Sequence, residues 1–418
     1  MTPTDLCFDR IARFDDELHA FTALDDARAR ADAATSAARI ATGTARVLEG
    51  WPIAIKANIA VAGLATTAGV EARRHDIARD DAEVVARLRR AGAVILGHVN
   101  MHEAALGATT DNAAYGRTEN PHRAGMTPGG SSGGSGAAVA AGLCRAALGT
   151  DTLGSIRIPA AYNGVYGLKP TNGLVPDDGV VPLSRRLDCV GPLARSVADL
   201  GAVMAVLAPL AYTPPIVRIA RLAVADEFDG IDPAVRAAYH LAADLLAGLG
   251  LLVKTAATPD LGLNAARMGG FVESARDSAA YYADELTRLP DGFSPQFRAM
   301  LAYGMAVTSD ELAHGAAAMT VAATRLHAVL LQADAILLPT APQPAFNHGC
   351  ATVTQADFTA LANLAGLPAL ALPAGWTDDG LPVGVQLIGR AGSERALLTL
   401  AAQLDAVIGG YRPPAAYT

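Results

Sequence analysis

Three residues of types that together can carry out nucleophilic catalysis lie in the first half of the sequence. Lys56 follows the apolar run 52–55, Ser131 lies in a glycine- and serine-rich loop at 125–136, and Ser155 ends a second small-residue segment. A serine hydroxyl is a weak nucleophile and needs a base to remove its proton. Burial lowers the pKa of a lysine, so a buried Lys56 would be a neutral amine near neutral pH and able to act as that base.

The two serine loops have the composition of a site for developing negative charge. Glycines allow close backbone approach, and N–H groups before a helix stabilise an oxyanion. Other interpretations stay open at this point. Gly/Ser-rich segments are often only flexible loops, and Lys56 alone could be a lysine paired with a carboxylate. Phosphate-binding patterns such as GxxxxGK[ST] are missing. Residues 130–134 also match GxSxG, which would make Ser132 the nucleophile, although a Gly/Ser run fits that pattern by chance.

The elements that must position these residues alternate between helix and strand. We expect helix over 1–46, a buried strand at 52–55 that delivers Lys56 to the interior, a helix at 82–91 and a strand at 93–96. A helix should follow the first serine loop at about 137–143, and mixed helices should continue to about 330. Further expected elements are strands at 336–338, 370–372 and 383–388 and a closing helix at about 394–407. This order predicts an α/β fold, and no linker marks a domain boundary.

Composition narrows the class of protein. The chain has 418 residues, of which 51% are hydrophobic and 18% charged, so it can bury a large core. The formal net charge of −8 and the lack of a basic stripe argue against nucleic-acid binding. Its four cysteines form no CxxC pair, which argues against a disulfide scaffold or a zinc site and fits a cytoplasmic protein. No signal peptide and no membrane span are expected.

Several ordered motifs resemble the amidase signature family. The segments are PGGSSGGS at 128–135, LGTDTLGSIRIP at 148–159, GLKPT at 167–171, GPLARSVAD at 191–199, NLAGLP at 363–368 and GLPVGVQLIG at 380–389. The run 52–56, PIAIK, is similar to the segment that carries the family's lysine. Because the resemblance runs from about residue 50 to 405, it is more specific than any single pattern. It implies a single-domain α/β fold with a central mixed sheet flanked by helices on both faces.

The resemblance also implies roles for individual residues. Ser155 would be the nucleophile, Ser131 the bridging serine after a cis peptide bond, and Lys56 the base. The backbone N–H groups of Thr152, Leu153, Gly154 and Ser155 would form the oxyanion hole. Ser132 and Asp151 would support the triad, and Thr127 and Arg157 would contact substrate. The family needs no metal or organic cofactor.

The implied activity is hydrolysis of a carboxamide, with a small linear amide as the first expectation. Residues 98–123 resemble the carboxybiuret hydrolase branch of the family. The first alternative is the glutaminase subunit of a tRNA-dependent amidotransferase, which passes ammonia to a partner subunit, although the chain is somewhat short for that role. A non-catalytic glycine-loop binding protein is an alternative of another class. The expected ligand is a small amide, and a homodimer is the expectation from relatives.

Three residues depart from the family's usual pattern, namely Leu153, where glycine is common, Ala57 after the lysine, and Trp51 before the strand. They put substrate preference in doubt more than activity. Arg157 has two interpretations, a clamp for a substrate carboxylate or a structural anchor tied to Asp151 or to carbonyls, and we favour the anchor. Arg276 and Arg117 are weaker candidates for a clamp. The segment 260–350 is expected to line the substrate pocket.

Overall fold

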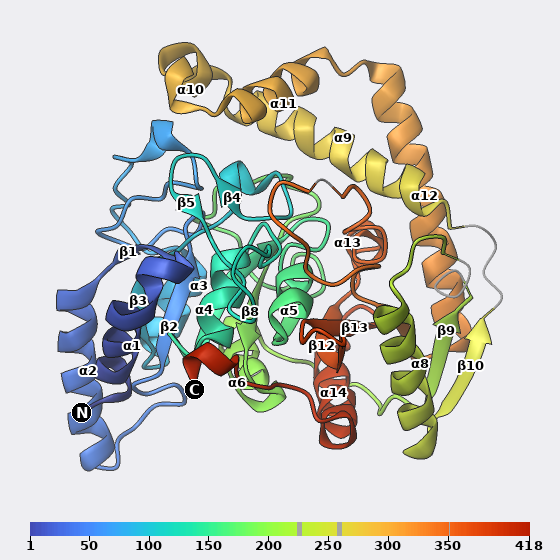
Figure 1. Cartoon of the computed structure of the whole chain (residues 1–418), viewed down its shortest axis with the longest axis horizontal. Coiled ribbons are helices and arrows are strands. Elements are labelled where there is room, and N and C mark those ends of the chain that lie inside the picture. The colour runs from blue at the N-terminus through green and yellow to red at the C-terminus, as the bar shows by residue number, and fades with distance from the viewer. Residues whose placement is uncertain (224–227, 257–260, 351) are drawn as a thin grey trace.

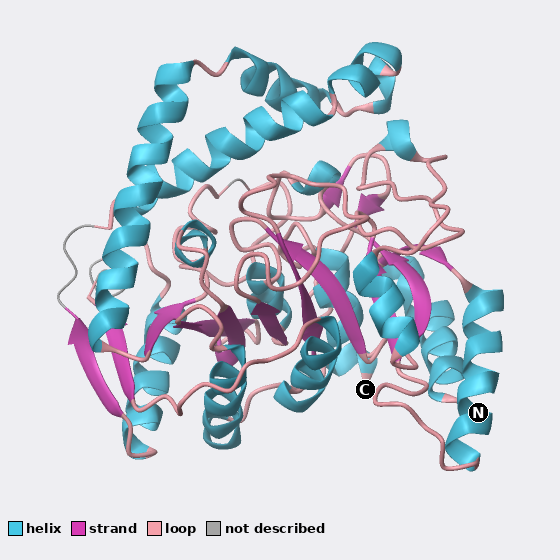
Figure 2. Cartoon of the chain, turned by 180° about the vertical axis from the view of Figure 1, so that it is seen from behind, coloured by secondary structure: helices cyan, strands magenta, loops and turns pink. Residues whose placement is uncertain are grey.

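A mixed sheet is the central layer of the computed structural model, which describes residues 1–223, 228–256, 261–350 and 352–418 (Figures 1 and 2). Eleven strands of this sheet are found in that part of the chain. Across the sheet they are β1 (Phe21–Leu24), β3 (Val94–Val99), β2 (Pro52–Lys56), β6 (Ala146–Asp151), β8 (Cys189–Ala194), β7 (Tyr166–Lys169), β12 (Ala369–Trp376), β13 (Pro382–Gly389), β11 (Ala335–Pro339), β9 (Arg218–Leu222) and β10 (Leu252–Ala256). A separate small ribbon joins β4 (Asp111–Asn112) to β5 (Gly116–Arg117).

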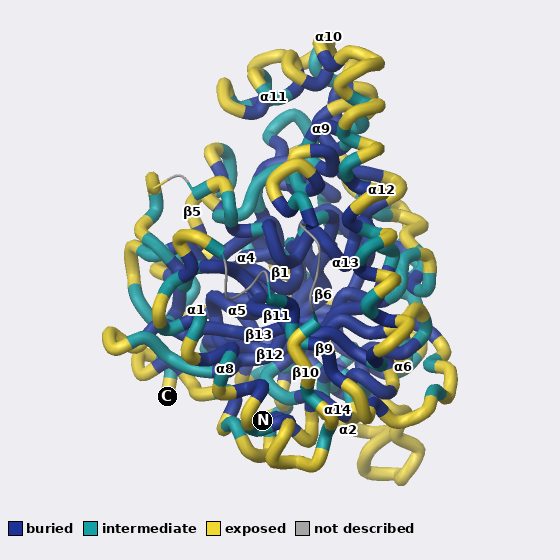
Figure 3. Tube along the Cα trace, turned by 90° about the vertical axis from the view of Figure 1, so that its right-hand side faces the viewer, coloured by how far each residue is buried: buried dark blue, intermediate teal, exposed yellow. Residues whose placement is uncertain are grey.

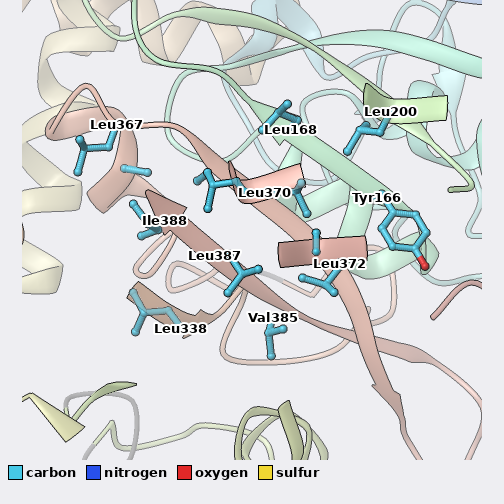
Figure 4. Packing of buried hydrophobic residues seen from close by; sticks show 14 of the residues in the cluster. Tyr166, Leu168, Leu200, Leu338, Leu367, Leu370, Leu372, Val385, Leu387 and Ile388 are labelled. Carbon is cyan, nitrogen blue, oxygen red and sulfur yellow. The ribbon is translucent and has the colours of Figure 1, made fainter. Parts of the chain in front are cut away.

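Parallel pairing occurs in two parts of this sheet. Strand β2 runs parallel to both β3 and β6, and β9 runs parallel to both β11 and β10. The strands between them, from β6 to β11, pair antiparallel. Figure 4 shows the centre, where cross-strand neighbours Leu370 and Leu387, and Leu372 and Val385, are packed in the core.

Helices cover both faces of the sheet, as the family resemblance implied (Figure 2). The described helices are α1 (Pro3–Leu18), α2 (Asp26–Ala41), α3 (Glu83–Arg90), α4 (Gly133–Ala140), α5 (Arg157–Asn163), α6 (Val197–Leu207), α8 (Pro233–Gly248), α9 (Leu263–Tyr281), α10 (Ala283–Arg288), α11 (Pro295–Ala306), α12 (Ser309–Gln332), α13 (Ala360–Leu364) and α14 (Glu394–Ile408). None of these described helices combines the length and the apolar character that a membrane span requires.

The alternation of β2 sets the direction of Lys56. Ile53 and Ile55 pack in the cluster that includes α3 and α6, whereas Ala54 packs in the cluster that includes α4. Successive side chains of a strand point to opposite faces, so Lys56 shares the face of Ala54. The lysine therefore points toward α4, the helix that follows the first serine loop.

Helices α9, α10 and α11 form a layer above the ends of the central strands, and α12 runs down from this layer along the side of the molecule near β9 (Figure 1). Figure 3 shows the central strands buried while much of α10 and α11 is exposed. Helix α9 packs tightly on α12, because a Cβ at Gly269 would lie 2.5 Å from the carbonyl oxygen of Gly315. This layer covers the serine loops.

The structure differs from the sequence-based expectation in four places. The segment 1–46 is two helices separated by β1, which pairs antiparallel with β3. Helix α4 begins at Gly133 rather than near 137. Gly133 has no room for a side chain, because a Cβ there would lie 2.3 Å from Thr110 Oγ1. Strands β7, β8, β9 and β10 interrupt the region that we expected to be helical up to 330, and β6 precedes Ser155 where we expected only a turn.

Candidate active site

Lys56 and Ser131 are in direct contact inside the protein. Lys56 is the last residue of β2, and its side chain is completely buried. Its Nζ donates hydrogen bonds to Ser131 Oγ and to Thr150 Oγ1, both at 2.7 Å. Asn58 Nδ2 donates a further hydrogen bond to Thr150 Oγ1 at 3.3 Å. The strand thus delivers Lys56 to the serine loop, as the apolar run before it predicted.

Burial makes the Lys56 amine available as a base. It lowers the pKa of Lys56 from 10.5 to about 7, because an ammonium ion loses its hydration in the interior. The negative charges of Asp188 and Asp151 act in the opposite direction but do not restore the ordinary value. A large fraction of Lys56 is therefore neutral near pH 7 and can accept a proton from Ser131.

Close backbone packing fixes the loop that carries Ser131. The peptide bond between Gly130 and Ser131 is cis. Gly130 has no room for a side chain, since a Cβ there would lie 2.6 Å from the backbone nitrogen of Thr109. The backbone N–H of His102 donates to the carbonyl oxygen of Ser131 at 3.0 Å. These contacts hold Ser131 Oγ beside Lys56.

Ser132 joins the two serine loops. Its N–H donates to the carbonyl oxygen of Ser155 at 3.2 Å. Its hydroxyl donates to the carbonyl oxygen of Thr150 at 3.2 Å and accepts from the Thr150 N–H at 3.3 Å. Because Ser132 is fully buried, its hydroxyl is not presented to a ligand as a GxSxG nucleophile would be.

Ser155 lies on the turn between β6 and α5 and lines a cavity of about 590 Å³. The residue is partly exposed, and its hydroxyl makes no hydrogen bond within the described chain. The Lys56–Ser131 contact is therefore formed, whereas a hydroxyl contact between Ser131 and Ser155 is not. Ser155 is the one member of the predicted triad that faces the cavity.

Three backbone N–H groups around Ser155 are available to an oxyanion. Within the described chain, the N–H groups of Thr152, Leu153 and Ser155 donate no hydrogen bond. The Gly154 N–H, which we also expected in the oxyanion hole, instead donates to Asp151 Oδ1 at 2.8 Å. Gly154 is needed for the turn itself, with a φ of +135° and no space for a Cβ.

Asp151 organises this turn through a buried ion pair. Arg157 donates from Nη2 to Asp151 Oδ1 and from Nε to Oδ2, both at 3.0 Å, and neither side chain is exposed. Burial alone would raise the pKa of Asp151, but the guanidinium, the Lys169 charge and a hydrogen bond from Asn363 bring it to about 2. The carboxylate is therefore ionised at any pH at which Lys56 is neutral.

Residues 3–398 match the Amidase family model. The chain belongs to the amidase signature family. Among its relatives is the A subunit of the glutamyl-tRNA(Gln) amidotransferase of Roseiflexus castenholzii (strain DSM 13941 / HLO8), which is 38% identical over 440 residues covering 94% of this chain and 90% of that protein.

Solved structures of amidase signature proteins share the whole fold. One, of an amidase, has a TM-score of 0.90 and 33% identity, covering 98% of this chain and 97% of that chain. Another is an inhibitor-bound structure from work on a vestigial protein complex and the evolutionary origins of an s-triazine catabolic enzyme. It has a TM-score of 0.90 and 32% identity, covering 99% of this chain and 96% of that chain.

Neither of the two candidate substrate contacts, Arg157 and Thr127, lines the cavity of this amidase signature protein. Besides its pair with Asp151, Arg157 donates to Gln386 Oε1 at 2.7 Å and to Asn363 Oδ1 at 2.6 Å. These contacts favour the anchor interpretation over a clamp. Thr127 is also fully buried, and its hydroxyl donates to the carbonyl oxygen of Thr109 at 2.8 Å.

The weaker clamp candidates do not line the cavity either. Arg276 is exposed on α9 and donates to the carbonyl oxygen of Val307, and Arg117 is exposed and paired with Glu119. The arginine that lines the cavity is Arg267, which sequence reasoning missed. It lies in the region 260–350, where no motif distinguishes one arginine from another.

Of the three departures from the family pattern, Leu153 alone lines the cavity. Its side chain lies against α9, since a Cβ at Gly270 would be 2.7 Å from Leu153 Cδ2. Ala57 is buried beside Met101, and Trp51 lies under the guanidinium of Arg145. Leu153 is thus the departure that can alter the substrate site.

Sequence reasoning also missed Thr150 and Asp188. Thr150 accepts the second hydrogen bond of Lys56, and Asp188 carries a negative charge that acts on the same lysine. Thr150 directly precedes Asp151 inside one of the family motifs, so its position carried a signal. Asp188 precedes the motif at 191–199 by a short interval, and only the fold brings it to the site.

Proposed function

We propose that this amidase signature protein hydrolyses a carboxamide C–N bond through an acyl-enzyme on Ser155. The observation that carries the proposal is the 2.7 Å hydrogen bond from the buried Lys56 to Ser131, beside a cavity into which Ser155 faces. A neutral lysine beside a buried serine is a base coupled to a proton relay. A partly exposed serine near three free N–H groups is a nucleophile beside an oxyanion site.

The geometry supports the following sequence of steps. Ser155 turns toward Ser131, Lys56 takes the proton of Ser131, and Ser131 takes the proton of Ser155. The Ser155 oxygen attacks the amide carbonyl, and the N–H groups of Thr152, Leu153 and Ser155 donate to the oxyanion. The relay returns the proton to the leaving nitrogen, which departs as ammonia or an amine. Water then attacks the acyl carbon and gives a proton to the relay, the ester bond to Ser155 breaks, and the Ser155 oxygen takes a proton back from the relay as the carboxylate product leaves.

Labelling with a fluorophosphonate tests the nucleophile. Intact mass and peptide mapping should place one adduct on Ser155, with no adduct in Ser155→Ala and slow labelling in Lys56→Ala. Ser132→Ala should still be labelled on Ser155. An adduct on Ser132 in the unaltered protein would contradict the assignment. Absence of any adduct, together with ligand binding unchanged in Ser155→Ala, would support a non-catalytic binding protein.

Two forms of this reaction differ in the fate of ammonia. The similarity to A subunits of glutamyl-tRNA(Gln) amidotransferases, at 38% identity over nearly the whole chain, supports the form in which glutamine is the amide and a partner subunit receives the ammonia. The fit to an amidase structure at a TM-score of 0.90 is compatible with a free-standing amidase acting on a small linear amide. The names of the sequence relatives favour the first form.

Ammonia release with and without a partner separates the two forms. A glutaminase subunit should co-purify from its own cells with a tRNA-binding subunit, and glutamine hydrolysis should rise when that subunit is present. A free-standing amidase should elute without a partner and hydrolyse amides other than glutamine at full rate. A protein that hydrolyses glutamine no better with a partner would count against the subunit form.

A further inference from the structure

One face of α9 turns toward the cavity next to Ser155. Arg267, Phe271 and Ser274 line the cavity, and their spacing of four and three residues places them on one side of a helix. Gly270, on the same helix, lies against the side chain of Leu153 in the oxyanion turn. Arg267 precedes Gly270 by three residues, which is about 4.5 Å along a helix axis, so Arg267 lies within one helical turn of the contact with Leu153.

The Arg267 guanidinium is held in place on one side and free on the other. Its Nε is hydrogen-bonded to the buried carboxylate of Asp357, and its Nη2 donates to Asn264 Oδ1 at 2.6 Å. Within the described chain Nη1 contacts no oxygen acceptor, its neighbour being the sulfur of Met268 at 3.5 Å. The ion pair therefore orients a guanidinium that still has donors for a ligand.

The rest of the cavity is poor in charge. Much of the described lining is apolar, including Leu106, Ile158, Leu183 and Met300, and the other charged side chain that lines it is the exposed Asp111. Burial lowers the pKa of the lining His102 to about 4, so this imidazole is neutral at pH 7. Among the described residues, Arg267 is thus the cation that a bound anion would meet.

We propose that Arg267 is a specificity-determining residue that binds a carboxylate at the far end of the acyl group. The substrate class is then a monoamide of a dicarboxylic acid, or an amino acid with a side-chain amide, with an apolar stretch between carboxylate and scissile carbonyl. This inference rests on the proposed function, because it assumes that the scissile carbonyl sits at Ser155. The contrasting role for Arg267 is purely structural, tying α9 to Asp357.

Protection of Ser155 from a fluorophosphonate tests the proposal without requiring turnover. Glutaramate and pentanamide form a matched pair of ligands, in which a carboxylate replaces a terminal methyl group. In the unaltered protein, glutaramate should protect Ser155 at concentrations about 10–100-fold lower than pentanamide, as expected for one hydrogen-bonded charge pair. Arg267→Gln should lose this preference while pentanamide protects as before, and Arg267→Lys should keep part of it.

Arg276→Gln is the matched control, because Arg276 lies on the same helix but is exposed and donates to a backbone carbonyl. It should leave the preference for glutaramate unchanged. The rate at which Ser155 of Arg267→Gln is labelled without ligand shows whether the active site is intact. If Arg267→Gln does not fold, the comparison of the two ligands is made with Arg267→Lys alone. Equal protection by both ligands in the unaltered protein, or equal loss of both in Arg267→Gln and Arg267→Lys, would overturn the proposal. Failure to label Ser155 at all would instead overturn the proposed function.

Discussion

The hydroxyl of Thr152 donates a 2.5 Å hydrogen bond to the carboxylate of Asp188. The second carboxylate oxygen of Asp188 accepts the backbone N–H groups of Leu183 at 2.8 Å and Ser184 at 3.1 Å. Because Thr152 and Leu183 both line the cavity, Asp188 ties the oxyanion turn to a second segment of the cavity wall. Burial raises the pKa of Asp188 to about 6, while these hydrogen bonds and the Lys56 charge act against that rise.

Asp188→Asn should lower the labelling rate of Ser155 about 10–100-fold. A single amide oxygen cannot accept from both the Thr152 hydroxyl and the N–H groups of Leu183 and Ser184, so the Thr152 N–H is less well placed. The change also removes a negative charge that raises the pKa of Lys56, so the pH at which labelling is half-maximal should move to lower values. Rates measured between pH 5 and 9 check both effects. Asp15→Asn is the control, since Asp15 is a carboxylate of similarly raised pKa that accepts two backbone N–H groups elsewhere. A lower rate with no change in the pH profile would mean that Asp188 acts only as a structural anchor.

Activity should fall as the pH drops through about 7. The active form of Lys56 is the neutral amine, and burial places its pKa near that value, so protonation on the acid side removes the base. Labelling of Ser155 followed against pH should show one ionisation on the acid limb. Lys56→Arg, which stays protonated, should label about 10²–10⁴-fold more slowly at every pH. Persistence of the same acid limb in Lys56→Arg would assign it to another group.

How far the sequence could predict this site depends on how each residue is held. Lys56 ends a short apolar run that predicts a buried strand, and Ser131 and Ser155 lie in long motifs, so the sequence could predict that these residues form one site. The sequence could not predict that the Gly154 N–H donates to Asp151, because this hydrogen bond depends on the shape of one turn. Arg267 reaches the cavity because α9 crosses above it, and nothing local to residue 267 records that arrangement.

The same distinction applies to the fold. Strands β11 and β12 contain the apolar runs 336–338 and 370–372, and β13 contains the run 383–388 in which apolar residues alternate with glycine and glutamine. The structure confirms all three strands close to the predicted residues. Strand β1 is a four-residue edge strand between two helical segments, so its pairing with β3 comes from tertiary contacts rather than from its own pattern. Strand β10 is largely exposed and lacks the apolar pattern of a central strand.

Gly154→Ala should reduce the labelling rate of Ser155 by about 10²–10³-fold, the effect of losing an oxyanion donor. The added Cβ would lie 2.2 Å from Thr359 Oγ1, and φ at this residue is +135°, so the turn must move. Gly173→Ala is the matched control, with a positive φ of +75° and nothing within 4 Å of the added Cβ. Equal effects of the two substitutions would show that backbone strain, rather than displacement of the oxyanion turn, lowers the rate.

Arg157→Met should destabilise the protein by about 3–5 kcal/mol, because it leaves the buried Asp151 carboxylate without its cation. In the unaltered protein the pKa of Asp151 is about 2, below its ordinary value of 3.8. The contribution of this carboxylate to the free energy of unfolding is therefore present above pH 3.8 and is lost as the pH falls through 2. Without the guanidinium this pKa rises above the unfolded value, and stability should then decrease as the pH increases from 4 to 7. Urea unfolding at several pH values measures both the loss and its pH dependence. Arg74→Met, which removes the exposed pair with Glu71, should cost about 0–1 kcal/mol, and a similar cost for Arg157→Met would contradict the anchor role of Arg157.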